Sequence, residues 1–509
     1  MKFNHQITEE EYIELCDVFN QILNLDEELE ELIAVPWMHI IREHPEVLMR
    51  YHFLFTRNKS ILTRIERVKI YLRVGLQKIK QSFSKYLFKG KNHFDNKFQL
   101  ASVDFLFITH FLNQDSVNQK NDFYFGVIPN LLKKMGYNVL VAGVPHFTNE
   151  HSYDRQALLD AYISKCVFKK KMSDRDEHEL QLKIKLAKTK INQLIKRQSS
   201  IQKKVILEYS MLLLETQVAK TNLRIFEQVK VLLRQTTPRY VIVPYEGHGL
   251  ERLIFRAATK SPITKSIAYQ HTGTFRLSNA IKQNIIGYNP DYVFVSGPEA
   301  KDYLKQFELN FKIPIQVLGS SRGRLTNVNI LSNHAFKSRL SCLVLPEGIM
   351  EECTLLFGVS LACAKLLPNI KFIWRVHPII NLDSVLRSSH IFRNIPSNIE
   401  ISNNTIDEDI NSSSWTLYRG TTAVYKAISA GLRPIYFKNK ESMTIDPVYK
   451  LDSWRMIAKN PQDIVNFIES DIKNCFQEHI QFSSLAIKIC DERFAPIDME
   501  VFNKLIHSE

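Results

Sequence analysis

Short runs of apolar residues alternate with stretches of helical length along most of the chain. In the first half these runs cover residues 103–109, 136–143, 239–243, 265–269, 291–296 and 315–318, and in the second half 341–345, 371–376, 399–402, 415–418 and 433–437. Uninterrupted apolar strands separated by helices are typical of parallel sheets that are covered on both faces. The pattern therefore predicts an α/β protein with two Rossmann-like domains in series, facing each other across a cleft.

Two segments depart from this alternation. Residues 1–100 have a helical pattern, and residues 172–235 are a long, charged helical stretch that we expect to form a helical hairpin inserted in the first α/β domain. A polar linker near residue 330 separates the two halves. The expected organisation is a helical region at 1–100, an N-terminal Rossmann-like domain at 101–325 with the insertion at 172–235, a C-terminal Rossmann-like domain at 326–490 and a C-terminal helix at 491–509.

Most of the net charge of +14 lies around one predicted helix, from Ile61 to Phe88. Apolar residues recur in it at steps of three and four, and between residues 57 and 91 there are eleven Lys or Arg and one acid, Glu66. A basic amphipathic helix can bind an anionic membrane surface, at roughly 1 kcal/mol per basic residue near the surface. The alternative is a solvated face on a helix that packs against the body of the protein. Nucleic acid is not favoured, because no RNP-like aromatic pattern or helix-turn-helix accompanies the charge.

Composition excludes several other classes. Hydrophobic residues make up 45% and charged residues 24%, which is ordinary for a globular protein. The charged N-terminus predicts no signal peptide, and no apolar run is long enough to span a membrane, so we expect a cytoplasmic protein. The seven cysteines are scattered without a CxxC pair, which favours reduced thiols over a zinc or disulfide framework.

Known cofactor and metal motifs are missing from the strand ends. No GxGxxG, GxxxxGK[ST] or HExxH pattern occurs. The two DxD-like stretches, at 174–176 and 407–409, do not follow a predicted strand. We therefore expect no metal requirement and no bound cofactor.

Polar clusters follow three predicted strands of the first half. In open α/β sheets, ligands bind at the carboxyl ends of the strands. Glu246 suits a general base or a partner for sugar hydroxyls, or else it caps the next helix. His271 suits an acid/base or ligand contact, or else it bonds to a neighbouring loop. Gly319, Ser320 and Arg322 suit an anion cradle, or else form a hinge with solvated arginines.

Three further clusters follow strands of the second half. Glu347 and Gly348 come after 341–345, where the glycine permits close approach to a ligand; Glu347 is otherwise a residue of the next helix's first turn. Arg375, His377 and Pro378 follow the next strand, with Arg375 and His377 on one face. Arg419, Gly420, Thr421 and Thr422 lead into a helix, where they suit a phosphate or a simple threonine N-cap. Together the clusters predict an anionic, nucleotide-linked ligand.

These motifs resemble those of a known group of enzymes. The matching stretches are Tyr245-Glu246-Gly247-His248, Tyr269-Gln270-His271, Leu318-Gly319-Ser320, Leu345-Pro346-Glu347-Gly348, Arg375-Val376-His377-Pro378 and 417–423 with 430–434. They resemble bacterial surface-polysaccharide glycosyltransferases of the GT-B superfamily, which build capsule and lipopolysaccharide. The second half is similar to Kdo transferases, bacterial sialyltransferases and CDP-glycerol glycerophosphotransferases. The resemblance covers about residues 236–440.

The resemblance implies a GT-B fold and a metal-independent transfer of a sugar, such as Kdo or another ulosonic acid, from a CMP-linked donor to a surface-glycan acceptor. His377 and Pro378 would contact the cytidine monophosphate, and Gly420, Thr421 and Thr422 would hold the phosphate. The base would be Glu246 or Glu347, with His271 assisting. Such an enzyme would work peripherally on the cytoplasmic face of the membrane. A CDP-linked glycerophosphate or polyol-phosphate transferase is the alternative, and a non-catalytic scaffold of a polysaccharide assembly complex is the third option.

Overall fold

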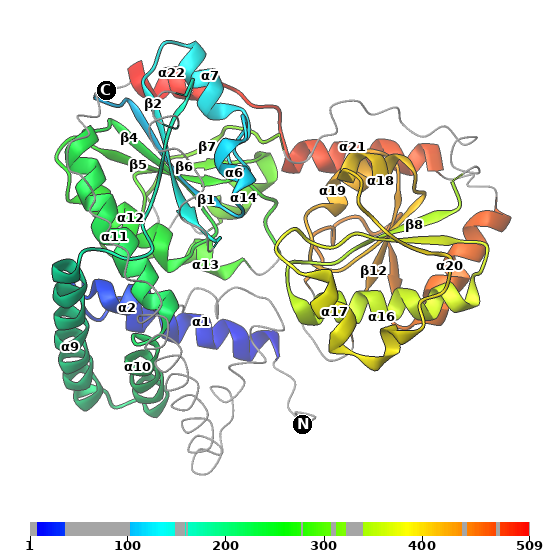
Figure 1. The fold of residues 1–509 in the computed structure, drawn as a ribbon, viewed down its shortest axis with the longest axis horizontal. Coiled ribbons are helices and arrows are strands. Elements are labelled where there is room, and N and C mark those ends of the chain that lie inside the picture. Colours follow the sequence, from blue (N-terminus) through cyan, green and yellow to red (C-terminus); the bar gives the residue numbers. More distant parts are fainter. Residues whose placement is uncertain are drawn as a thin grey trace. The chain divides into compact units, whose positions relative to one another are not determined.

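The computed structural model describes residues 8–35, 102–147, 158, 161–275, 278–306, 312–321, 339–439, 445–474 and 479–507. The chain forms two compact units (Figure 1). Unit 1 comprises residues 1–270, 278–294 and 304–316, and unit 2 comprises 271–277, 295–303 and 317–509. The segments after three strands of the first sheet are thus counted with unit 2.

The first sheet has seven strands in the order β3-β2-β1-β4-β5-β6-β7. The strands are β1 (Phe105–Phe111), β2 (Val139–Pro145), β3 (Ser164–Val167), β4 (Tyr240–Pro244), β5 (Lys265–Gln270), β6 (Tyr292–Val295) and β7 (Ile315–Val317). The pairings from β3 through β5 are parallel. The order runs outward from β1 in one direction and from β4 in the other, so the topology reverses between these two strands.

The second sheet repeats this arrangement with six parallel strands, in the order β10-β9-β8-β11-β12-β13. Its strands are β8 (Ser341–Leu345), β9 (Lys371–Trp374), β10 (Ile399–Ile401), β11 (Trp415–Tyr418), β12 (Arg433–Phe437) and β13 (Met456–Ala458). Its reversal lies between β8 and β11. The expected α/β fold with two Rossmann-like parallel sheets is confirmed.

Two edge strands were missing from the sequence prediction. They are β3 and β13, which are short and only partly buried. The apolar-run criterion detects strands that are covered on both faces, and an edge strand need not be apolar throughout. The sequence SKCV of β3 therefore gives no signal of its own.

In unit 1, helices cover both faces of the sheet (Figure 1). The helices between its strands are α6 (Asp115–Asn118), α7 (Ile128–Lys134), α12 (Gly249–Thr259), α13 (Asn279–Lys282) and α14 (Pro298–Lys305). Residues 298–303 of α14 are counted with unit 2. The β1-α7-β2 and β4-α12-β5 connections leave the reversal point in opposite directions. Because such crossovers are right-handed, α7 and α12 lie on opposite faces.

The predicted helical insertion consists of three helices, α9 (Asp174–Arg197), α10 (Ile201–Leu213) and α11 (Gln217–Thr236). Each begins at a hydroxyl cap, Ser173, Ser200 or Thr216, whose side chain accepts a backbone N–H of the first turn. Helices α9 and α10 pack against each other, and α11 packs on α12. Helix α11 is thus also the helix that leads into β4.

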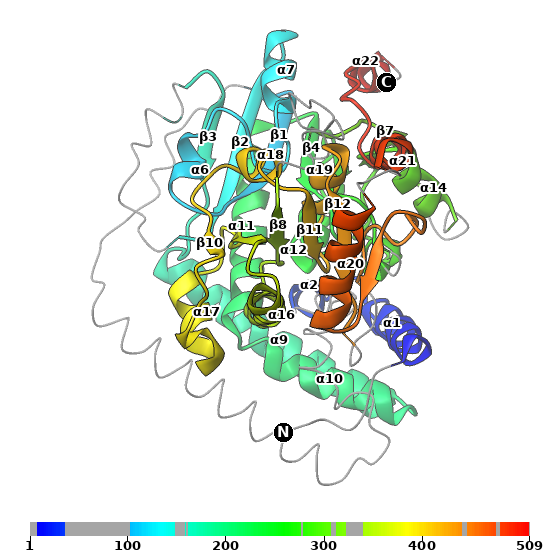
Figure 2. The ribbon, with the colours of Figure 1, turned by 90° about the vertical axis from the view of Figure 1, so that its right-hand side faces the viewer.

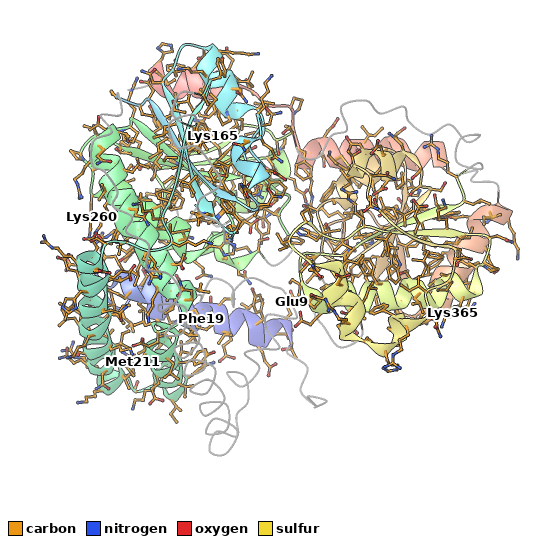
Figure 3. The ribbon with its side chains drawn as sticks, viewed as in Figure 1. Glu9, Phe19, Lys165, Met211, Lys260 and Lys365 are labelled. Carbon is orange, nitrogen blue, oxygen red and sulfur yellow. The ribbon has the colours of Figure 1, made fainter. Side chains whose placement is uncertain are left out.

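The N-terminal helices α1 (Glu9–Leu23) and α2 (Glu30–Ala34) pack on unit 1. Phe19 of α1 is buried, and Lys260 at the end of α12 pairs with Glu30 at 2.8 Å (Figure 3). The side-chain amide of Asn222 on α11 donates to the carbonyl of Ala34 at 2.8 Å. These contacts join the N-terminal helices to the body of the unit.

In unit 2, helices also cover both faces of the sheet (Figure 2). The helices counted with this unit after the second sheet begins are α16 (Met350–Leu366), α17 (Leu382–Ser388), η2 (His390–Arg393), α18 (Ile406–Asn411), α19 (Val424–Ser429), α20 (Pro461–Lys473), α21 (His479–Arg493) and α22 (Glu500–His507). Helix α16 packs with α20, and α19 packs with α21. At the centre of the core, Phe357 stacks on Trp374 with ring centroids 4.5 Å apart, and the Trp374 indole donates to Ser360 at 2.8 Å.

Two predictions concern residues outside the described part of the chain. The basic helix predicted from Ile61 to Phe88 and the side chain of Arg322 both fall there. The domain boundaries and the cleft expected between the domains stay predictions. Among the described helices, none is both long enough and apolar enough to cross a membrane.

Truncating Phe357 to alanine should destabilise unit 2 by about 3–5 kcal/mol, because the stacked partner of Trp374 is lost and a cavity remains. The change is measured as a shift in the denaturant midpoint of tryptophan fluorescence. Leu366→Ala is the matched control, since Leu366 lies on the same helix and is 53% exposed. We expect the control to stay within about 0.5 kcal/mol of wild type; equal losses in both variants would contradict the assigned core.

Candidate functional site

A buried carboxylate shapes the loop after β4. Glu251, in the first turn of α12, accepts the backbone N–H groups of Glu246 at 3.0 Å, Gly247 at 2.8 Å and His248 at 3.0 Å. Burial raises the pKa of Glu251 to about 7, while His248 and the N–H donors act in the opposite direction. The capping role considered for Glu246 therefore belongs to Glu251, and Glu246 sits in the loop that Glu251 holds.

The Glu246 side chain lies beside an imidazole. Its Oε2 is 3.1 Å from His248 Nε2, and the two side chains are 26% and 21% exposed. A carboxylate paired with a partly exposed imidazole can accept hydroxyl donors and take up a proton. Glu246 thus lies where a ligand can reach it, at the reversal point of the first sheet.

Gly247 is required for this loop. Its φ is +87°, and a Cβ there would collide with the backbone of Ala280. Arg252, which is fully buried, holds the opposing segment by donating to the carbonyls of Ala280 at 3.2 Å and Gln283 at 2.8 Å. The loop and its surroundings are therefore closely packed before any ligand binds.

Two histidines that sequence reasoning missed lie at the same edge of the sheet. His110 is the penultimate residue of β1, and His146 follows β2. His110 Nδ1 is 3.0 Å from His146 Nε2. The pKa of His110 is lowered to about 3, mainly by burial and then by the charges of His146 and His248, while Glu246 raises it. The signal for both is their position, since His110 directly follows the apolar run 103–109 and His146 comes three residues after the run 136–143.

His271, Gly319 and Ser320, also predicted from the first half, are counted with unit 2. His271 is buried, and its carbonyl accepts the Ser320 hydroxyl at 3.1 Å. The Ser320 N–H donates to the carbonyl of Ala495 at 2.9 Å, and a Cβ on Gly319 would collide with Pro496. This segment thus uses its backbone to hold the C-terminal chain. Ligand contact by His271, Gly319 and Ser320 stays a prediction.

Four residues of the second half converge at the reversal point of the second sheet. Glu347 and Gly348 follow β8, Gly420 follows β11, and His377 follows β9. A Cβ on Gly420 would collide with Glu347 Oε1, and one on Gly348 would lie 2.9 Å from His377 Nδ1. The two glycines therefore let three loops approach closely at the carboxyl ends of β8, β9 and β11, where ligands of such sheets bind.

The His377 ring has a defined tautomer when neutral. Its Nδ1 accepts the backbone N–H of Ile379 at 3.4 Å, so the proton of the neutral ring is on Nε2. The side chain is partly exposed, and Pro378 beside it is exposed. His377 can therefore present an N–H donor to an anionic group.

The two predicted arginines are engaged in ion pairs. Arg375 Nη1 lies 2.7 Å from Asp409, which is buried. Arg419 is buried, donates to Glu352 at 2.7 Å and to the Phe437 carbonyl at 3.0 Å. Both guanidinium groups connect elements of unit 2. Their contact with a donor stays a prediction, and so does that of Arg322.

Thr421 and Thr422 come directly before α19 and are partly exposed. Thr421 Oγ1 accepts the Ala423 N–H at 3.3 Å, and the Thr422 carbonyl accepts the Tyr425 N–H at 3.1 Å. Helix α19 has only six residues, so its dipole contributes little. An anion here would rely on hydroxyl and backbone contacts.

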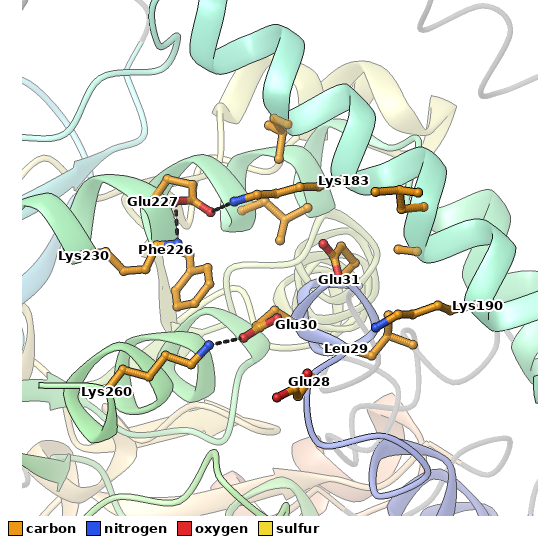
Figure 4. Close-up of a pocket in the computed structure, with 14 residues that line it drawn as sticks. Glu28, Leu29, Glu30, Glu31, Lys183, Lys190, Phe226, Glu227, Lys230 and Lys260 are labelled. Carbon is orange, nitrogen blue, oxygen red and sulfur yellow. Dashed lines mark hydrogen bonds and ion pairs between the residues drawn. The ribbon is translucent and has the colours of Figure 1, made fainter.

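A pocket of about 310 Å³ lies away from the strand ends, among α2, α9, α11 and α12 (Figure 4). Its charged groups largely neutralise one another: Glu227 lies 2.6 Å from both Lys183 and Lys230, and Lys260 pairs with Glu30. No polar group identified from the strand ends lines it. We therefore place the candidate site at the strand ends and not in this pocket. In the described part of the chain, no group of three or more His, Cys, Asp or Glu is arranged to hold a metal ion.

No protein-family model matches this sequence, and no curated protein matches it. Solved structures of similar architecture exist. TcCGT1 in complex with UDP matches with a TM-score of 0.48 at 10% identity, over 80% of this chain and 98% of that one. UDP-GlcNAc 2-epimerase from Neisseria meningitidis, bound to UDP-GlcNAc, matches with a TM-score of 0.45 at 12% identity, over 80% of this chain and 100% of that one. The Methanocaldococcus jannaschii UDP-GlcNAc 2-epimerase, in complex with UDP-GlcNAc and UDP, matches with a TM-score of 0.44 at 12% identity, over 76% of this chain and 99% of that one. These likenesses concern the fold and assign no activity.

Replacing Glu251 by alanine should lower the free energy of unfolding by about 1–3 kcal/mol, because three backbone N–H groups lose their acceptor. Thermal unfolding followed by circular dichroism measures the change. Glu179→Ala removes a carboxylate from an exposed ion pair with Arg175 and should cost at most about 0.5 kcal/mol. A Glu251→Ala protein as stable as this control would show that the loop does not depend on the carboxylate.

Proposed function

We propose that this protein is a glycosyltransferase that moves a sugar, such as Kdo or another ulosonic acid, from a CMP-linked donor to a bacterial surface-glycan acceptor. The observation that supports it is the convergence of Glu347, Gly348, His377 and Gly420 at the reversal point of the second sheet. Within this set, the motif resemblance assigns His377 and Gly420 to the donor nucleotide and makes Glu347 one of two candidate bases. No metal or cofactor is part of the proposal.

The roles follow from charge. A departing nucleotide leaves with a negative phosphate, and an N–H donor such as His377 Nε2 stabilises it. The hydroxyls of Thr421 and Thr422 and the Gly420 backbone are suited to the phosphate oxygens. Losing one preorganised hydrogen-bond donor of this kind typically lowers the rate about 10²–10³-fold.

Of the two candidate bases, Glu246 suits proton uptake better. Glu347 lies against Gly420, in the loop proposed to hold the phosphate, where two negative groups would repel each other. We assign Glu347 to hydroxyl groups of the bound donor. Glu246, paired with His248, takes the proton of the acceptor hydroxyl as the new C–O bond forms.

Thermal-shift measurements with CMP, CDP, UDP and GDP test the donor. The matching nucleotide, which we expect to be CMP, should raise the melting temperature, by about 2–4 °C for each kcal/mol of binding linkage. A response to CDP alone would favour the CDP-linked polyol-phosphate transferase. If none of the four nucleotides stabilises the protein, the transferase proposal fails and a non-catalytic scaffold of a polysaccharide assembly complex is favoured instead.

The variant His377→Ala should weaken nucleotide binding about 10–100-fold, because a hydrogen bond to a charged phosphate is lost. Calorimetric titration of the responding nucleotide measures it. His390→Ala is the matched control, since His390 is an exposed histidine of unit 2 away from the strand ends. Unchanged affinity in the His377 variant would show that the residue does not belong to the site.

Gly420→Ala should also weaken nucleotide binding, since the added Cβ would displace Glu347.

We also propose that the segment from Ile61 to Phe88 binds an anionic membrane surface, on the basis of its sequence alone. Replacing four of its Lys or Arg residues by Glu should abolish sedimentation with vesicles that contain anionic lipid, and should leave the nucleotide-induced thermal shift intact. Vesicle binding that survives the charge reversal, or that is equal for neutral vesicles, would refute this role.

A further inference from the structure

His110 and His146 form an imidazole pair to which neither the sequence motifs nor the proposed function gives a task. The two rings come from neighbouring strands: β1 and β2 pair in parallel with His110 opposite Val144, so His146 lies two residues further on the same face. The ring centroids are 5.1 Å apart, and Nδ1 of His110 is 3.0 Å from Nε2 of His146.

A hydrogen bond between two imidazole nitrogens holds one proton. When it belongs to His110, Nε2 of the neutral His110 ring is a bare acceptor; when it belongs to His146, the proton of His110 is on Nε2 and that atom is a donor. The position of one proton in the pair therefore decides whether His110 offers an acceptor or a donor at its other nitrogen. In the described part of the chain, no hydrogen bond is made by His110 Nε2, and the residue is partly exposed.

The surroundings favour protonation of His146 over His110. His146 is the more exposed of the two residues, with Lys170 nearby, whereas His110 lies deeper, next to the Tyr124 ring at 5.6 Å. The other titratable groups that act on His110 are Glu246 and His248, from the loop after β4. Burial and Lys170 lower the pKa of His146, and His110 has its own pKa lowered to about 3, burial being the main cause. As the pH falls, His146 is protonated first and must donate to His110, which places the His110 proton on Nε2.

We propose that His110 Nε2 binds a hydroxyl group of the ligand beside Glu246, and that His146 is a positioning residue that sets, through the shared proton, whether this nitrogen donates or accepts. The ligand class is a polyhydroxyl compound. This inference rests on the proposed function, in which that ligand is the sugar acceptor. No covalent step is involved, and proton uptake from the reacting hydroxyl remains with Glu246.

The test uses the full chain labelled with ¹⁵N-histidine, and imidazole NMR spectra from pH 4 to 8. In wild type, His110 should stay neutral throughout and should show the Nε2–H tautomer increasingly as His146 is protonated. His146→Phe keeps a ring but removes the shared proton, so the His110 tautomer should no longer follow this titration. His178→Phe, an exposed histidine of α9, should leave the His110 signals unchanged.

Ligand contact is tested with methyl α-D-glucoside as the polyhydroxyl probe, against tetrahydropyran, a ring without hydroxyls. The glucoside should shift the His110 Nε2 resonance, and tetrahydropyran should not. Binding should weaken about 3–10-fold in His110→Ala, as expected for one lost hydrogen bond. His110→Gln, whose amide reaches the Nε2 position, should restore binding without its pH dependence.

The outcomes separate the two proposals. A His110 tautomer that is the same in wild type and His146→Phe at every pH overturns the positioning role, and a glucoside that leaves the His110 resonance unchanged overturns the hydroxyl contact. Neither result depends on nucleotide binding. A protein that passes both tests but binds none of the four nucleotides would retain the imidazole pair and lose the proposed glycosyl transfer.

Discussion

Both units depend on one topological constraint of parallel sheets. Because crossovers are right-handed, adding strands toward one edge of the sheet places every connecting helix on the same face. A sheet with helices on both faces must therefore reverse its strand order once. Here the reversal falls between β1 and β4 and again between β8 and β11. The loops after the central strands then diverge toward opposite faces. Each unit thereby acquires a place where polar side chains gather without interrupting the core.

Charged groups inside the units are arranged to hold those loops. Glu251 accepts three N–H groups after β4, and Arg419 joins α16 to the end of β11 through Glu352. Arg493, at the end of α21, joins that helix to Glu299 and the Thr274 carbonyl. A buried charge without such partners would be strongly destabilising. The groups exposed at the edges, such as Glu246 and His377, are consequently those that remain accessible to a ligand, while their neighbours position them.

Most of the architecture could be predicted because central strands have a sequence signal of their own. Runs such as SCLVL and WTLY are buried on both faces, and the structure places strands at 341–345 and 415–418 as expected. The two edge strands gave no such signal. At the site, the polar residues after β4, β8 and β9 could be identified from the sequence. His110 and His146 could not, because His110 lies inside β1 and His146 stands between Pro145 and Phe147 without a glycine or second polar residue beside it. Arginine was the least informative residue, since a guanidinium beside a glycine suits a phosphate and a buried carboxylate equally well.

The sequence by itself determined the element order, the two parallel sheets and the set of residues that end the strands, because hydrophobic periodicity and glycine placement are local properties. Tertiary structure alone decided which of those residues meet. Glu347 contacts the Gly420 loop across 73 residues of chain, and Arg419 pairs with Glu352 across 67. Strand order brings such residues together, and it is set by the packing of whole helices and strands. The sequence around Arg419 or His110 does not predict which residue the fold places beside it.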